Sequence, residues 1–157
     1  MTISFAGHSL VVFSDTVKEI VKAEMRKNIS GTDRITCYIG GYGDFDQICA
    51  RASRELKNEF AGIEIVWVTP YMTTSAQEKI REMQAYGLCD SSLYPPLENV
   101  PPRFAISKRN EWMIENSDVV LAYVNHNYGG AYKSFCVAKR KQKKIINVFD
   151  LFAKRTT

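Results

Sequence analysis

Short apolar runs alternate with longer amphipathic segments along the whole chain. Five runs have the length of strands, are rich in β-branched or aromatic residues and are mostly continuous: residues 3–6, 35–39, 63–68, 119–124 and 145–149. A strand that is apolar on both faces belongs inside a parallel sheet with helices on each side. The five runs therefore predict the centre of an α/β domain.

The segments between these runs have the spacing of helices. Apolar faces are predicted in residues 14–28, 45–60, 106–116 and 130–141. Residues 69–102 are irregular: a helix over 75–86 with Ile80 and Met83 inward is expected, but 87–102 contains four prolines. The order of elements predicts a single Rossmann-like, doubly wound domain over residues 1–157. Its mostly parallel sheet should have about five strands, with helices on both faces.

The composition and the cysteine spacing indicate the class of protein and its cellular compartment. The 157 residues are 45% hydrophobic and 24% charged, which suits one domain with one core. No apolar run approaches the roughly 18 residues of a membrane span, and the first residues do not resemble a signal peptide. The four cysteines lack the paired spacing of a zinc site or a disulfide framework. We therefore expect a cytoplasmic protein with reduced thiols, no metal, no membrane association and no resident cofactor.

The net charge of +4 is unevenly distributed. From Lys133 to the end, the chain has eight basic residues and one acidic residue, whereas the remainder carries a small net negative charge. A basic region of this kind can attract a nucleotide or a nucleic acid. The alternative is a solvated helix end whose cations favour the helix dipole. We interpret the excess as part of an anion-binding edge.

In open α/β sheets, ligands bind outside the carboxyl ends of the strands, near the point where the strand order reverses. Gly7, His8 and Ser9 follow the first predicted strand. Glycine permits a close backbone approach, while the histidine and serine side chains can bind a sugar or a phosphate. The G-x-G-x-x-G dinucleotide motif is absent here, and a purely structural role for His8 is the alternative.

A glycine-rich segment follows the second predicted strand and opens a helix. Its candidate ligand-binding residues are Gly40, Gly41, Tyr42, Gly43, Asp44 and Asp46. Backbone N–H groups at a helix start can bind an anion, because the helix dipole also favours negative charge there. Asp44 and Asp46 either cap the helix or accept hydrogen bonds from ribose hydroxyls.

The fourth predicted strand leads into a second glycine-rich helix start. Its candidate ligand-binding residues are Asn125, Tyr128, Gly129 and Gly130, followed by Lys133. The two glycines could bind a phosphate and Tyr128 could stack on a base. A tight turn from strand to helix is the alternative.

The helix between these two regions supplies polar candidates. Arg103 and Asn110 are seven residues apart and share a face if the helix begins at Pro102. Arg109 can bind a phosphate through two hydrogen bonds, and a surface ion pair is the alternative for each arginine.

These motifs together resemble the SLOG superfamily, a Rossmann-like group that includes the Lonely-guy phosphoribohydrolases and the single-strand-binding domain of DNA-processing proteins. The matching segments are residues 5–9, 40–46, 103–110 with Met113 and 117–118, and Gly129-Gly130. The resemblance implies that a nucleotide or nucleotide-derived ligand binds at the carboxyl edge of the sheet. An Arg-Lys pair holds phosphate in Lonely-guy enzymes, and Arg109-Asn110 at that place retains the arginine.

The sequence departs from the Lonely-guy motif P-G-G-x-G-T-x-x-E after Gly130. Residues 131–136 contain Lys133 and no carboxylate. Cleavage of an N-glycosidic bond passes through an oxocarbenium-like transition state, which a carboxylate stabilises. A lysine would instead favour a phosphate. The sequence therefore favours binding over catalysis.

The leading hypothesis is a small module that binds a nucleotide-derived ligand as a sensor, a sequestering protein or a partner-controlled unit. We predict phosphate contacts from 40–43, 129–130 and Arg109, and ribose or base contacts from His8, Asp46 and Tyr128. The first alternative is an N-glycosidase or deoxyribosyltransferase acting on nucleoside monophosphates through Asp44 or Asp46. The second is single-stranded nucleic acid binding by the basic C-terminal region. Pairing of two copies through Trp112, Phe135 or the 94–96 loop is a further expectation.

Overall fold

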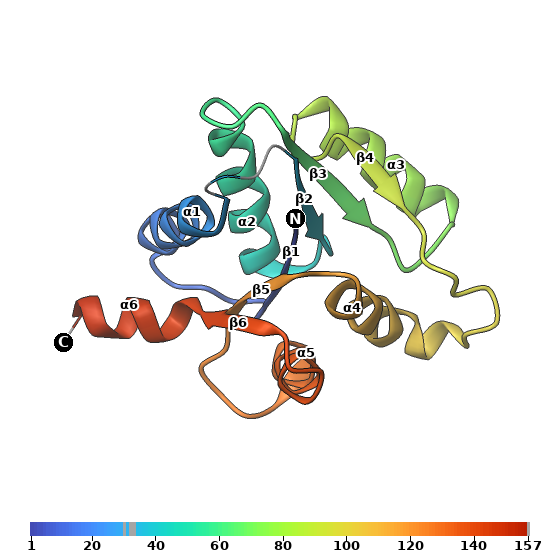
Figure 1. Ribbon diagram of the computed structural model, residues 1–157. Coiled ribbons are helices and arrows are strands. Elements are labelled where there is room, and N and C mark those ends of the chain that lie inside the picture. Colours follow the sequence, from blue (N-terminus) through green and yellow to red (C-terminus); the bar gives the residue numbers. More distant parts are fainter. Residues whose placement is uncertain (30, 32–33, 157) are drawn as a thin grey trace.

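A computed structural model describes residues 1–29, 31 and 34–156, and shows a six-stranded sheet between two layers of helices (Figure 1). The strands are β1 (Thr2–Gly7), β2 (Ile35–Ile39), β3 (Ile63–Val68), β4 (Ser91–Leu93), β5 (Val119–Tyr123) and β6 (Lys144–Asn147). The α-helices are α1 (Ser14–Ile29), α2 (Gly43–Leu56), α3 (Thr74–Ala85), α4 (Ala105–Glu115), α5 (Gly129–Arg140) and α6 (Val148–Thr156). A 3₁₀ turn, η1 (Pro102–Phe104), precedes α4.

The order of strands reverses near the centre of the sheet. All neighbouring strands are parallel, in the order β4-β3-β2-β1-β5-β6. From β1 the chain moves outward through β2, β3 and β4, and then returns to the other side of β1 as β5. The strand order therefore reverses between β1 and β5, whose carboxyl ends meet where Gly7 pairs with Tyr123. This is the place where doubly wound sheets bind ligands.

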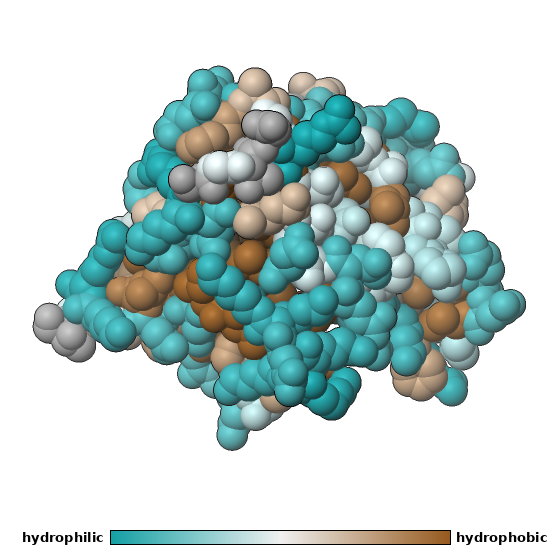
Figure 2. Space-filling model, viewed as in Figure 1, coloured by the Kyte–Doolittle hydropathy of each residue, from teal (hydrophilic) through white to brown (hydrophobic). Residues whose placement is uncertain are grey.

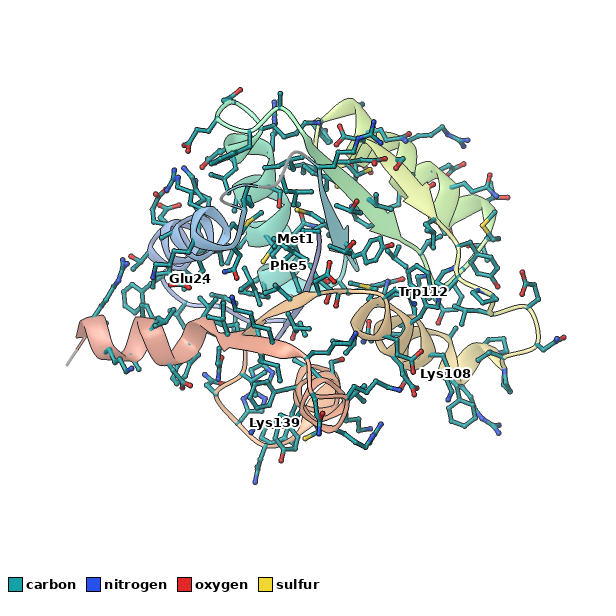
Figure 3. All side chains as sticks on the ribbon, viewed as in Figure 1. Met1, Phe5, Glu24, Lys108, Trp112 and Lys139 are labelled. Carbon is teal, nitrogen blue, oxygen red and sulfur yellow. The ribbon has the colours of Figure 1, made fainter. Side chains whose placement is uncertain are left out.

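The strands that were predicted to be apolar on both faces form the core. In β1, Ile3 and Phe5 belong to the large apolar cluster that also includes residues of α1 and α2. On the opposite face, Ala6 packs with Ile114 of α4 and Ala138 of α5. Figure 3 shows Phe5 among the side chains at the centre of the molecule. Both faces are thus buried over Ile3–Ala6 of β1 and along the whole of β5, whereas Thr36 and Tyr38 of β2 are only partly buried.

The structure corrects two expectations of the element assignment. The sheet has six strands rather than about five, because Ser91–Leu93 pairs with the free edge of β3. Asp90 supports this added strand: its carboxylate accepts a hydrogen bond from the Ile65 amide, and its own amide donates to the Ile65 carbonyl. In addition, the strand predicted over 145–149 ends at Asn147, and Val148 begins α6. The helix predicted over 75–86 is confirmed as α3, with Ile80 and Met83 buried.

The basic residues of the C-terminal segment lie mainly at the amino edge of the sheet, away from the reversal point. Helix α5 starts beyond the carboxyl end of β5 and ends where β6 begins, so Lys139 and Arg140 lie at the amino edge. Lys143 confirms this position, because it donates hydrogen bonds to the Glu115 and Ser117 carbonyls just before β5. The interpretation of the whole charge excess as part of a carboxyl-edge anion site was therefore wrong.

The visible surface in Figure 2 is mostly hydrophilic, and its hydrophobic residues appear as separate patches. Trp112, one candidate for pairing two copies, is partly buried against Tyr38, with ring centroids 5.4 Å apart. Phe135, another candidate, lies beneath the Lys139 ammonium, and Lys139 is labelled on α5 in Figure 3. Pairing through these residues stays a prediction. Among the described helices, none is both long enough and apolar enough to cross a membrane.

Candidate functional site

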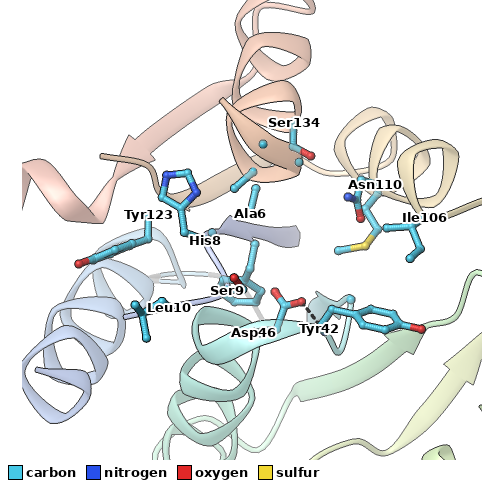
Figure 4. Close-up of a pocket in the computed structure, with 18 of the residues that line it drawn as sticks. Ala6, His8, Ser9, Leu10, Tyr42, Asp46, Ile106, Asn110, Tyr123 and Ser134 are labelled. Carbon is cyan, nitrogen blue, oxygen red and sulfur yellow. Dashed lines mark hydrogen bonds between the residues drawn. The ribbon is translucent and has the colours of Figure 1, made fainter. Parts of the chain in front are cut away.

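A cavity of about 760 Å³ opens where the strand order reverses. The ends of β1 and β5 form its floor, and the starts of α2 and α5 and one side of α4 form its walls (Figure 4). Thirteen of the residues singled out from the sequence line it: Gly7, His8, Ser9, Gly40, Tyr42, Gly43, Asp46, Arg109, Asn110, Asn125, Tyr128, Gly129 and Gly130. The fold therefore brings together motifs that are more than 120 residues apart in the chain.

Four predicted site residues do not line this cavity: Gly41, Asp44, Arg103 and Lys133. Gly41 has a φ of +85°, and a Cβ there would overlap the Trp67 ring, so its glycine is required by the fold. Lys133 is exposed on the first turns of α5.

Asp44 and Arg103 have local partners instead. The Asp44 carboxylate accepts a hydrogen bond from the Val11 amide at 3.0 Å, and this attaches the 9–13 loop to α2. The Arg103 guanidinium lies 4.8 Å from the centroid of the Phe104 ring. The seven-residue spacing to Asn110 does not keep Arg103 on the cavity face, because residues 102–104 form a 3₁₀ turn with a different angular step.

Arg109 is a buried structural link. Its side chain is only 1% exposed. Nη1 donates to the Gly40 and Val68 carbonyls, each at 2.7 Å, and Nε donates to Asn110 Oδ1 at 2.8 Å. The guanidinium thus joins the carboxyl ends of β2 and β3 to α4, and the Tyr42 ring centroid lies 5.5 Å from its carbon. Burial lowers the Arg109 pKa, while the nearby Asp46 carboxylate acts in the opposite direction. Direct contact of Arg109 with a phosphate stays a prediction.

Asp46 is a buried carboxylate on the α2 side of the cavity. Burial raises its pKa to about 6, although hydrogen bonding to the Tyr42 amide, the positive charge of Arg109 and hydrogen bonding to the Gly41 amide act in the opposite direction. Oδ2 accepts the hydrogen bond from the Tyr42 amide at 2.9 Å (Figure 4). A buried carboxyl group that has a raised pKa and lines a cavity is a candidate functional residue.

His8 lies at the floor of the cavity and is stacked against a second histidine. The His8 and His126 ring centroids are 3.5 Å apart, with an angle of 10° between the rings. On its other side His126 meets Tyr128, with centroids 4.0 Å apart. Asn125 holds both imidazoles. Its backbone N–H donates to His8 Nε2 at 3.2 Å, and its side-chain oxygen lies 2.7 Å from His126 Nδ1.

The start of α5 is open toward the cavity. Tyr128 is the N-cap residue, and no side chain caps the first turn. Gly129 has a φ of +88°, which favours glycine at this position. Gly130 has no such requirement, and a Cβ added there would meet nothing within 4 Å. The fold alone therefore gives no reason for glycine at position 130.

His126 and the apolar rim of the cavity were not among the site residues predicted from the sequence. Leu10 and Val12, which follow β1, line the cavity and are 76% and 61% exposed, and Ile106 of α4 adds a third apolar side chain. Hydrophobic residues in an exposed loop beside a predicted strand end are a signal that could have found the rim. His126 could have been found because it follows a predicted strand, as His8 does.

Comparisons with known proteins relate the chain to one kind of structure. No protein-family model matches the sequence, and no similar sequence was found among curated proteins. Solved structures that are similar in fold include two of DNA processing protein A. DNA processing protein A (DprA) from Streptococcus pneumoniae aligns with a TM-score of 0.62 and 12% identity, over 92% of this chain and 48% of that one. The chain thus spans about half the length of that protein.

The second structure is DNA processing protein A from Helicobacter pylori, whose description concerns its single-stranded DNA binding mode. It aligns with a TM-score of 0.59 and 16% identity, over 99% of this chain and 73% of that one. The chain shares the Rossmann-like fold of these proteins. At such identities the likeness establishes architecture alone, and the resemblance to Lonely-guy enzymes stays a prediction.

Proposed function

We propose that the cavity binds a nucleotide-derived ligand. The observation that carries this proposal is the open start of α5, where Gly130 faces empty space beside the aromatic ring of Tyr128. A helix start without a capping side chain presents free backbone N–H groups and a positive dipole end to an anion. The Tyr128 ring provides a surface for a base.

The two helix starts at the cavity offer different chemistry. At α2, the Asp44 amide already donates to the Ser9 carbonyl at 2.8 Å, and the Tyr42 amide donates to Asp46. Moreover, the buried carboxylate of Asp46 would repel a phosphate. We therefore place the phosphate at α5 and the sugar hydroxyls beside Asp46, which can accept their hydrogen bonds.

Gly130→Ala tests the position of the phosphate. Alanine should leave the fold intact or stabilise it by about 0.5–1 kcal/mol, because it replaces glycine in a helix. The added methyl group would occupy space that the ligand needs. We expect at least a roughly tenfold loss of affinity, equivalent to about 1.4 kcal/mol, for the tightest binder in a panel of adenine nucleotides, cyclic ADP-ribose species and cytokinin-type monophosphates. Calorimetry measures the affinity and thermal unfolding measures the stability.

Gly31→Ala is the matched control for this substitution. It also adds a methyl group where nothing lies within 4 Å, but residue 31 follows α1 and does not line the cavity. Its affinity for the ligand should equal that of the parent protein, even if the positive φ of Gly31 lowers its stability. Failure of every member of the panel to bind the parent protein would overturn the proposal.

Single-stranded DNA binding is a second candidate, favoured by the described activity of the H. pylori protein with the same fold. Exposed rings at the cavity mouth, Tyr42 and Tyr128, could stack on bases. The basic residues Lys139 and Arg140 lie at the other edge of the sheet, and Lys141 pairs with Glu115 at 2.8 Å. The geometry therefore separates the two surfaces that a single strand would need.

Salt dependence and two sets of variants test this candidate. If DNA binds the basic residues, affinity for an oligothymidylate should fall steeply with salt and be lost on neutralising Lys139, Arg140 and Lys141. If DNA binds at the cavity, Tyr128→Ala should weaken binding by about 1–3 kcal/mol, and the triple variant should change it little. Fluorescence anisotropy with a labelled oligonucleotide measures both. Binding that neither set of substitutions weakens would contradict this candidate.

A further inference from the structure

The two histidines of the sequence form one unit at the candidate site. His8 follows β1 and His126 follows β5, and these strands are neighbours at the reversal point. Their nearly parallel rings at 3.5 Å pack well while both are neutral. Two imidazolium cations at this separation would repel each other strongly, so the pair can accept one proton far more readily than two.

Hydrogen bonds identify which ring can accept that proton. Nε2 of His8 accepts a hydrogen bond from the backbone N–H of Asn125, so this nitrogen can take up a proton only by losing that bond. Nδ1 of His126 donates to the Asn125 side-chain oxygen, because an amide oxygen only accepts. His126 Nε2 is therefore the nitrogen of the pair that is available to a proton. Burial of His8 and the charge of His126 both lower the His8 pKa, in agreement with this assignment.

The start of α5 makes protonation of this pair depend on an anion. His126 lies two residues before the N-cap residue Tyr128, beside the positive end of the helix dipole. A cation is unfavourable there when the helix start is empty, and it becomes favourable when an anion is bound. The other titratable groups that line the cavity are Tyr42 and Asp46 of α2, Arg109 of α4, Tyr123 of β5 and Tyr128. Among them Asp46 is the group that could imitate a histidine effect, because its pKa is about 6.

We propose that the site takes up a proton on the His8–His126 pair together with an anionic group at the start of α5. The ligand class is a phosphoryl or sulfuryl group, and His126 is a ligand-binding residue that recognises it as an imidazolium. The proposal rests on the proposed function, because it requires the anion to bind at Gly129 and Gly130. It predicts that anion binding strengthens as the pH falls from 8 to 6, and that the bound anion shifts the histidine titration.

Inorganic sulfate is the appropriate probe, because it stays a dianion throughout this pH range while phosphate titrates itself. NMR spectra of the protein, titrated with sulfate, would follow the Gly129 and Gly130 amide signals and the imidazole nitrogens of the two histidines. We expect the sulfate Kd to be at least about fivefold lower at pH 6 than at pH 8, the lower range of typical coupling between two sites. At pH 7, sulfate should move the His126 nitrogen signals toward imidazolium values.

Two variants separate this effect from its alternatives. In Asp46→Asn the pH dependence of sulfate binding should persist, because that substitution removes the other group titrating near pH 6. In the double variant that combines Asp46→Asn with His126→Gln it should disappear. Sulfate shifts at Gly129 and Gly130 with a pH-independent Kd, or a pH dependence retained in the double variant, would overturn the proton coupling and leave the proposed function intact. Absence of shifts at these two glycines at every pH would overturn both.

Discussion

Replacing Arg109 with methionine is expected to lower the free energy of unfolding by about 3–5 kcal/mol, as found when one member of a buried polar or charged arrangement is removed. The Gly40 and Val68 carbonyls would lose the donor that they share, and Asp46 would lose its nearby cation. For a chain of this size the melting temperature should fall by roughly 6–20 °C. Thermal unfolding followed by circular dichroism measures the change.

Arg103→Met is the matched control. Arg103 lies only six residues earlier, but it is exposed and contacts the Phe104 ring. Its loss should change stability by no more than about 0.5 kcal/mol. Arg109→Lys should also be markedly destabilised, because one ammonium cannot reproduce the planar fork that reaches two carbonyls and an amide oxygen. Equal melting temperatures for the Arg103 and Arg109 variants would contradict the structural role of Arg109.

Asp46→Asn is expected to stabilise the protein at neutral pH and to weaken ligand binding. The folded protein holds the Asp46 proton more tightly than the unfolded chain, because burial raises its pKa from 3.8 to about 6. Stability from this group is therefore present in full below about pH 4 and is lost as the pH rises through 6. At 1.36 kcal/mol per pKa unit, the advantage of the asparagine variant should grow by up to about 3 kcal/mol between pH 4 and pH 7.

Chemical denaturation at a series of pH values measures this difference. Asp44→Asn is the control, because Asp44 is exposed and does not line the cavity. A stability difference that does not vary with pH would contradict the buried, titrating carboxylate.

The same two variants also test the glycosidase alternative, which needs a carboxylate near the anomeric carbon. Release of free base from a nucleoside monophosphate, retained in Asp44→Asn and abolished in Asp46→Asn, would support catalysis.

The sequence was informative where its pattern reports burial and chain reversal. Central strands could be predicted because they are apolar on both faces, and the cavity could be predicted because glycines follow their carboxyl ends. Strand β4 could not be predicted, since Ser-Ser-Leu has no apolar run and depends on the unpaired edge of β3. Helix α6 was hidden because Val148 and Phe149 continue the apolar run of β6.

The roles of the charged residues depended on contacts that are distant in the chain. Arg109 is adjacent to Lys108 in an ordinary amphipathic helix, and its burial depends on carbonyls of residues 40 and 68. The basic C-terminal segment could be counted but not placed, because its position depends on the direction in which α5 crosses the sheet. Helix α5 runs from the carboxyl edge to the amino edge of the sheet, so the basic residues of its last turn lie at the amino edge. The number of basic residues in the sequence could not indicate this position.

The edges of the sheet limit how copies of the protein could associate. A strand with unpaired N–H and C=O groups is a template on which a second chain can add its own strand. Here both edge strands are short, since β4 has three residues and β6 has four. Lys144 begins one edge, while Pro95 and Pro96 follow the other closely and lack backbone donors. Growth of a continuous sheet from one copy to the next is therefore disfavoured, which leaves helix faces and the 94–96 loop as the surfaces through which two copies could pair.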